Sequence, residues 1–180
     1  MQTYIALLRG INVSGSKIIK MELLREIFES MQLKDVKTYI QSGNVVFKTS
    51  VKDEAKLSEL VHKGLEKALG YKVEVVFRTP AELKKVIAKH PYGKIAAEET
   101  RKLYVAFLPH APAAEDLEKF IALGSAQEKF HFHERELYIA VDKEMLKPKF
   151  SNNILEKKLK SFATTRNWAT VNKLLEMAGE

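Results

Sequence analysis

A glycine-bearing segment near the N-terminus carries the residue types best suited to chemistry. Residues 10–17 read Gly-Ile-Asn-Val-Ser-Gly-Ser-Lys and lie between an apolar run and an amphipathic stretch. A phosphate-binding P-loop needs Gly-Lys-Ser/Thr, so that the lysine enters the helix and the hydroxyl reaches a magnesium ion. Here serine precedes lysine, which argues against nucleotide hydrolysis. Backbone N–H groups near Gly10 and Gly15 still suit a cradle for an anion. The alternative is a strand-to-helix turn without a ligand.

Basic residues are concentrated in two segments of the chain. Residues 1–21 contain Arg9, Lys17 and Lys20 and no acidic residue, which gives a net charge of +3. Residues 143–173 have a net charge of +6, and the whole chain has +7, so the remaining residues carry −2. This distribution indicates an anionic ligand or partner. Ordinary solubilising lysines are the alternative.

A predicted hairpin brings a second polar group to the same place. The strand-like residues 36–41 and 44–48 flank the turn dipeptide Ser42-Gly43. In a ferredoxin-like sheet the third strand lies antiparallel beside the first, so we expect this turn to meet the loop that leaves the first strand. The alternative is that the amides of both segments only hydrogen-bond loop backbone and that the arginine pairs with an acid. The predicted ligand-binding residues of the two segments are Arg9, Gly10, Asn12, Gly15, Lys17, Lys20, Ser42, Gly43 and Asn44.

The C-terminal basic segment contains a second candidate anion site. Arg166 and Asn167 stand where a helix is expected to begin, and a guanidinium beside free N–H groups suits an anion. Asn167 is alternatively only a helix cap, and Trp168 is expected in the core rather than as a stacking platform. We predict that Arg9 and Arg166 contribute to one continuous basic surface.

Other catalytic and metal chemistry lacks the necessary residues. His131 and His133 alternate on one strand without a third ligand, so no metal site is predicted. Ser42 has no Gly-x-Ser-x-Gly elbow, and no histidine has an evident aspartate partner. The absence of cysteine excludes thiol nucleophiles and disulfides. Catalytic residues and cofactors therefore stay unknown.

The elements that position these residues follow from apolar periodicity and turn signals. The pattern predicts an α+β fold with two ferredoxin-like βαββαβ subdomains, each with a four-stranded antiparallel sheet and two helices on one face. We place them at residues 1–78 and 79–180, and the second begins with a linking helix at Pro80 and ends with an extra C-terminal helix. The last strand, predicted at residues 161–165, is short and lies among good helix formers.

Three segments resemble the signature blocks of a known family. They are LRGINVSG (Leu8 to Gly15), TYIQSGNVVF (Thr38 to Phe47) and ATTRNWATVNKL (Ala163 to Leu174). They are similar to blocks of the bacterial domain-of-unknown-function 1697 family, and Ser14 departs from the second glycine that the family usually has. The resemblance implies an α+β fold of ferredoxin-like character and no established activity.

Composition limits the remaining function classes. With 46% apolar and 29% charged residues and no apolar run of the ~20 residues that span a bilayer, we expect a soluble cytoplasmic protein without a membrane partner.

Our hypothesis is a binding module for a phosphate-bearing or other anionic small ligand. A small enzyme that uses the same residues is one alternative, and binding of nucleic acid or an acidic partner by the basic C-terminal region is another. The first sheet lacks the aromatic block of RNA-binding sheets, although Tyr39 and Phe47 are present. The oligomeric state stays open.

Overall fold

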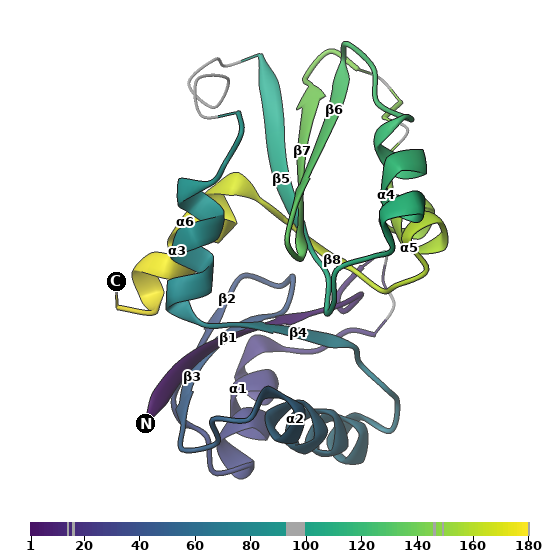
Figure 1. The fold of residues 1–180 in the computed structure, drawn as a ribbon. Helices are drawn as coiled ribbons and strands as arrows, with labels where there is room; N and C mark the ends of the chain where they lie inside the picture. The colour runs from purple at the N-terminus through teal and green to yellow at the C-terminus, as the bar shows by residue number, and fades with distance from the viewer. Residues whose placement is uncertain (14, 16, 93–99, 146, 149, 180) are drawn as a thin grey trace. The chain divides into compact units, whose positions relative to one another are not determined.

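The strands form two separate four-stranded antiparallel sheets (Figure 1). The computed structural model describes residues 1–13, 15, 17–92, 100–145, 147–148 and 150–179. Ser14 and Ser16 of the N-terminal loop lie outside the described residues. The chain divides into two compact units, one of residues 1–84 with 173–180 and one of residues 85–172. The fold is therefore α+β with two sheets, as the sequence predicts.

The first sheet has the strand order β2-β3-β1-β4, and two helices cover one of its faces (Figure 1). Its elements are β1 (Gln2–Leu8), α1 (Met21–Ser30), β2 (Lys34–Tyr39), β3 (Asn44–Thr49), α2 (Glu54–Leu69) and β4 (Val75–Arg78). Alternate residues of β1, including Tyr4 and Leu8, pack with buried side chains of the helices such as Phe28 and Leu57. The remaining β1 positions Ile5 and Leu7 are also buried, which explains the nearly continuous apolar run of this strand.

Local signals set the ends of α2. The Asp53 carboxylate accepts hydrogen bonds from the backbone N–H groups of Ala55 and Lys56 at 2.9 and 3.1 Å, which satisfies two donors at the helix start. Gly70 ends the helix in the left-handed conformation, with φ of 77°. Both ends agree with the sequence patterns.

The second sheet has the same topology, in the order β6-β7-β5-β8. Helices α4 and α5 cover one face of it (Figure 1), and Phe120 and Leu155 from these helices are buried in its core. Its elements are β5 (Arg101–Phe107), α4 (Ala114–Ile121), β6 (Glu128–His133), β7 (Glu136–Asp142), α5 (Asn152–Leu159) and β8 (Thr164–Asn167). Two further helices are α3 (Pro80–Ala88) and α6 (Trp168–Met177).

The last strand begins later than the sequence suggests. Lys160 ends α5 with φ of 52°, and residues 161–163 connect the helix to the sheet. Pairing with β5 starts only at Thr164, opposite Phe107. Helix α5 ends at Leu159, so the shift of the strand toward the C-terminus reflects where pairing with β5 begins and not a longer helix. Among the described residues, no helix is both long and apolar enough to cross a bilayer.

The strand registers align the two halves residue by residue. The N–H of Leu8 donates to the carbonyl of Gly43, and the N–H of Leu108 donates to that of Arg135, both at 2.9 Å. With Leu8 and Leu108 aligned, the strand pairings also align Arg78 of β4 with Arg166 of β8. Helix α3 follows the first of these strands, and α6 follows the second. The repeated unit thus includes a helix after each fourth strand, and a buried arginine occupies the same position in both units.

Candidate functional site

The loop after β1 and the turn before β3 lie together at one end of the first sheet. Antiparallel pairing of β1 with β3 brings Leu8 to Gly43, as the hairpin topology predicts. Gly43 has φ of 78°, and a Cβ atom there would lie 2.6 Å from Ile11 Cδ1 and 2.9 Å from Leu8 Cβ. Only glycine allows this close approach. The sequence-predicted residue Gly43 thus serves the packing of the turn against the loop.

The side chain of Asn12 holds the loop in place. Its Nδ2 donates to the carbonyl oxygens of Ile19 at 2.9 Å and Gln41 at 2.8 Å. Its Oδ1 accepts from the N–H of Ile19 at 2.7 Å. Asn12 itself has φ of 53°, a conformation that asparagine tolerates better than most residues. One amide therefore links the start of the loop, its end and the neighbouring turn.

Asn44 has a similar structural role in the turn. It is fully buried, and its Nδ2 donates to the carbonyl of Tyr39 and to the hydroxyl of Ser42, both at 2.9 Å. The amide donors of Asn12 and Asn44 are consequently directed at protein atoms. The polar groups that the sequence assigns to a ligand therefore form two sets. The amides stabilise the loop and the turn through hydrogen bonds to protein atoms, and the basic side chains are a separate set.

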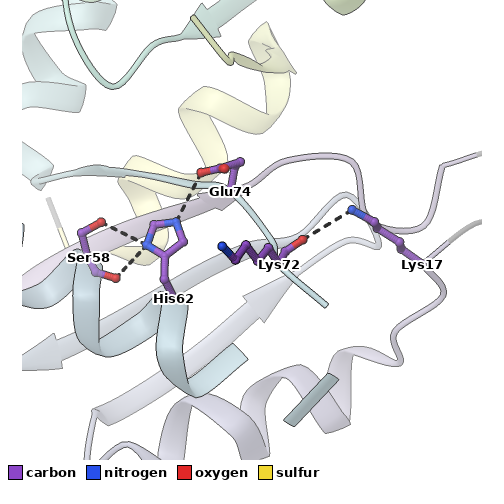
Figure 2. Close-up of polar contacts among 5 residues, drawn as sticks. All are labelled: Lys17, Ser58, His62, Lys72 and Glu74. Atoms are coloured by element: carbon purple, nitrogen blue, oxygen red, sulfur yellow. Dashed lines mark hydrogen bonds and ion pairs between the residues drawn. The ribbon is translucent and has the colours of Figure 1, made fainter. Parts of the chain in front are cut away.

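The bases of the loop are more accessible. Lys17 is exposed, and its Nζ donates to the carbonyl of Lys72 at 3.5 Å (Figure 2). The same Nζ lies 5.2 Å from the centre of the Tyr71 ring. Lys20 is exposed and precedes α1 without a side-chain capping bond. Arg9 is half-buried, and its backbone N–H donates to the carbonyl of Glu74 at 2.8 Å.

The glycines of the loop differ from the glycine of the turn. Gly10 and Gly15 are exposed and left-handed, with φ of 66° and 75°. Apart from the glycine itself and its chain neighbours, no described atom lies within 4 Å of a Cβ built at either position. Glycine at these two positions therefore suits the left-handed backbone, and no other described segment packs against it.

His62 lies beside this region and was not identified as a candidate from the sequence. His62 Nδ1 lies 2.7 Å from the carbonyl oxygen of Ser58 and 3.1 Å from its hydroxyl, while Nε2 lies 3.6 Å from Glu74 Oε2 (Figure 2). The spacing of Ser58 and His62 by four residues on a helix was the available signal. A carbonyl only accepts, so Nδ1 carries a hydrogen and cannot deprotonate the serine. The group is therefore not a serine-hydrolase triad, despite its Ser, His and Glu composition.

The C-terminal candidates lie in the other unit. Arg166 is buried, and its Nη1 donates to the hydroxyl of Thr164 at 2.7 Å and the carbonyl of Thr165 at 2.9 Å. Burial lowers the pKa of its guanidinium to about 10, so the group stays charged at neutral pH. Asn167 Oδ1 accepts from the N–H of Thr170 at 2.8 Å, the geometry of a helix cap. Because Arg166 is only 5% exposed, its guanidinium contributes little to the basic surface that the sequence predicts for Arg9 and Arg166.

An aromatic group surrounds His90 in this second unit. Its ring lies 4.0 Å from the ring of Trp168 and 5.4 Å from that of Tyr138, between ring centres. Nδ1 accepts from the N–H of Tyr92 at 3.2 Å, and the buried Nε2 finds no hydrogen-bond partner in the part of the chain that the structure describes. Burial lowers the pKa of His90 to about 4. His90 is therefore neutral at physiological pH, and sequence spacing offered no sign of this cluster.

His131 and His133 lie on β6, where His131 is exposed and 6.3 Å from the Tyr138 ring. Among residues 1–13, 15, 17–92, 100–145, 147–148 and 150–179, no three His, Asp or Glu side chains are grouped as metal ligands.

Comparisons with known proteins agree with this architecture. The family model described as "Protein of unknown function (DUF1697)" matches residues 1–138. A solved structure described as a conserved bacterial protein, SP0830, from Streptococcus pneumoniae is similar over 98% of each chain, with a TM-score of 0.74 and 20% identity. At that identity the likeness concerns the fold alone. A comparison with curated proteins found no match. The extent of the family match, over most of the sequence and across both signature segments of the first sheet, places this chain in the DUF1697 family of proteins of unknown function.

Proposed function

We propose that the loop of residues 9–20 binds a phosphate-bearing or other anionic small molecule. The observation that carries this proposal is the separation of roles within the loop. The Asn12 amide is bonded to backbone, whereas the ammonium groups of Lys17 and Lys20 belong to exposed residues. Residues 1–21 contain three bases and no acid. A segment of this kind attracts anions.

The hydrogen bonds of Asn12 support binding by fixing the loop before a ligand arrives. A loop that is already ordered loses less conformational freedom on binding, so more of the interaction energy contributes to affinity. No described segment beyond the immediate chain neighbours packs against Gly10 or Gly15, which favours the approach of a ligand to the backbone.

Lys17 is the best placed cation for a specific contact. An ammonium has three donors. One reaches the carbonyl of Lys72, and the ring of Tyr71 provides a second favourable contact. No further partner of this ammonium is found among the described residues, so it can also donate to anion oxygens, and the two protein contacts restrict the long side chain.

The first experiment is a thermal-shift screen of phosphate-bearing metabolites, followed by calorimetry on the compounds that raise the melting temperature. Lys17→Ala should weaken binding by about 1.5–3 kcal/mol, the usual worth of a charge-assisted hydrogen bond. The control is Lys129→Ala, because Lys129 is an exposed lysine of β6 in the other unit and its loss changes net charge equally. Equal weakening by both variants would indicate nonspecific attraction. A screen in which no anionic compound stabilises the protein would refute the proposal.

The same screen separates the alternative functions. Chemical turnover of a stabilising compound would identify an enzyme. Binding to duplex DNA that weakens steeply with salt, with a slope near −0.9 per phosphate contacted, would favour a nucleic-acid partner. Arg9→Ala should weaken ligand binding and leave folding nearly intact, and lost stability without a binding effect would make Arg9 a structural residue.

A further inference from the structure

Exposed aliphatic side chains gather around the same loop. Among the described residues, seven large hydrophobic side chains are exposed, and four of them lie between residues 13 and 40. Three of the four, Ile18, Val13 and Ile40, are exposed by 74%, 55% and 45% and belong to the loop or the adjoining turn. Scattered exposed hydrophobics are ordinary, but a group of them beside a ligand-binding segment indicates a contact surface.

Ile40 is also conformationally unfavourable. Its φ is 46°, and it is the one β-branched residue with positive φ among the non-glycine residues described. A β-branched side chain in this region is a genuine outlier, and glycine or asparagine would fit the turn at lower cost. Because Ile40 is 45% exposed, its burial contributes only part of the stabilising free energy that a fully buried isoleucine contributes. Such strain is typical of functional positions.

The bonds of Asn12 link the three backbone segments that carry these residues. Val13 follows Asn12 directly, Ile18 precedes Ile19, and Ile40 precedes Gln41, the two residues to which the Asn12 amide is bonded. Consecutive Cα atoms lie 3.8 Å apart, so all three Cα positions are within ~9 Å of the amide. The same amide thus fixes the backbone of the basic loop and of the turn next to these exposed aliphatic residues.

We propose that the anion bound here is amphiphilic, with a phosphate or similar head group that contacts Lys17 and Lys20 and an alkyl part that lies against Ile18 and Ile40. This inference rests on the proposed function of the loop and specifies its ligand class. The acid-free basic segment matches the charge of the head group, and the exposed aliphatic side chains match the alkyl part. A free alkyl phosphate and the head group of a phospholipid share this chemistry.

The test compares two monoesters of equal charge, methyl phosphate and hexyl phosphate, by calorimetry on the full chain. Hexyl phosphate should bind about tenfold more tightly, the effect of burying roughly two methylene groups. Ile40→Asn and Ile18→Ser should remove most of this difference, because they should weaken hexyl phosphate binding far more than methyl phosphate binding. Ile40→Asn should also leave the protein as stable as the wild type or more stable, because the substitution relieves backbone strain. Ile154→Asn, at a 40% exposed isoleucine of α5, is the matched control and should keep the full difference.

The outcomes distinguish the two proposals. Equal affinities for both esters in the wild type would overturn the amphiphilic ligand and leave anion binding intact. Absence of binding by both esters would overturn the two proposals together. Co-sedimentation with phosphatidylglycerol vesicles but not with phosphatidylcholine vesicles would support a lipid head group as the source. Tight hexyl phosphate binding without vesicle binding would support a free ligand.

Discussion

Acidification should protonate His90 only near pH 4, and the single tryptophan of the chain should report it. His90 Nδ1 accepts the N–H of Tyr92, so protonation at this nitrogen must break that bond as well as place a charge in a half-buried aromatic site. Burial lowers the pKa of His90 to about 4, from an ordinary value of about 6.5. The unfolded chain therefore binds a proton between these two pH values and the folded chain does not.

The sign of the effect follows from this difference. Between about pH 6.5 and pH 4 the unfolded state holds more protons, so the free energy of unfolding falls as pH falls through this window. A gap of about 2.5 between the pKa values sets an upper limit of ~3 kcal/mol. Because His90 is only half-buried, solvent screening reduces the expected loss to about 1–2 kcal/mol.

Two measurements check this prediction. Urea unfolding at pH 7 and pH 5 should show a larger loss of stability for the wild type than for His90→Phe, which keeps an aromatic ring but cannot be protonated. Trp168 fluorescence should be quenched on acidification with a midpoint near pH 4, because the imidazole lies 4.0 Å from the indole. A quenching midpoint near 6.5, or equal losses of stability in the two proteins, would refute the reasoning.

Two further predictions concern the loop and its turn. Gly43→Ala should destabilise the protein by about 2–4 kcal/mol in urea unfolding, since a Cβ there meets Ile11 Cδ1 at 2.6 Å in addition to the left-handed strain. Gly70→Ala has the same strain with open space around the Cβ and should cost only about 1–2 kcal/mol, so equal costs would contradict the packing argument. Asn12→Ala should cost about 2–4 kcal/mol through three lost hydrogen bonds and a less tolerated φ of 53°. Asn12→Gly should cost about 1 kcal/mol less, and a larger cost for glycine than for alanine would show that backbone strain is unimportant there.

The sequence predicted the fold well where local signals are strong. Asp53 and Gly70 mark the ends of α2 by chemistry that operates within a few residues, and the alternation of apolar residues identifies the paired strands. The contact between the loop and the turn followed from topology, because antiparallel pairing brings the end of β1 to the start of β3. The start of β8 was misplaced, because its first residue is set by pairing with β5, which begins only at Thr164.

The role of each polar residue in the candidate site was beyond sequence reasoning. Asn12 and Asn44 have the composition of ligand-binding amides, and the sequence left open whether they bind a ligand or the backbone. Three-dimensional proximity supplies backbone partners that the sequence does not reveal, because Gln41 is 29 residues from Asn12 in sequence yet its carbonyl lies 2.8 Å from the amide. The same holds for His62 and Glu74, and for the cluster of His90 with Trp168.

What the sequence determined by itself was therefore the order of the elements, the α+β class, and a basic segment without acids, all properties of neighbouring residues. Tertiary structure decided which amides are bonded to backbone, which histidine is half-buried and neutral, and which aliphatic side chains of the loop and the turn stay exposed. These properties depend on hydrogen-bond partners and solvent exclusion contributed by distant segments. Periodicity and spacing do not report such contacts, because the same residue type stands in the sequence whether its side chain binds a backbone carbonyl or a ligand.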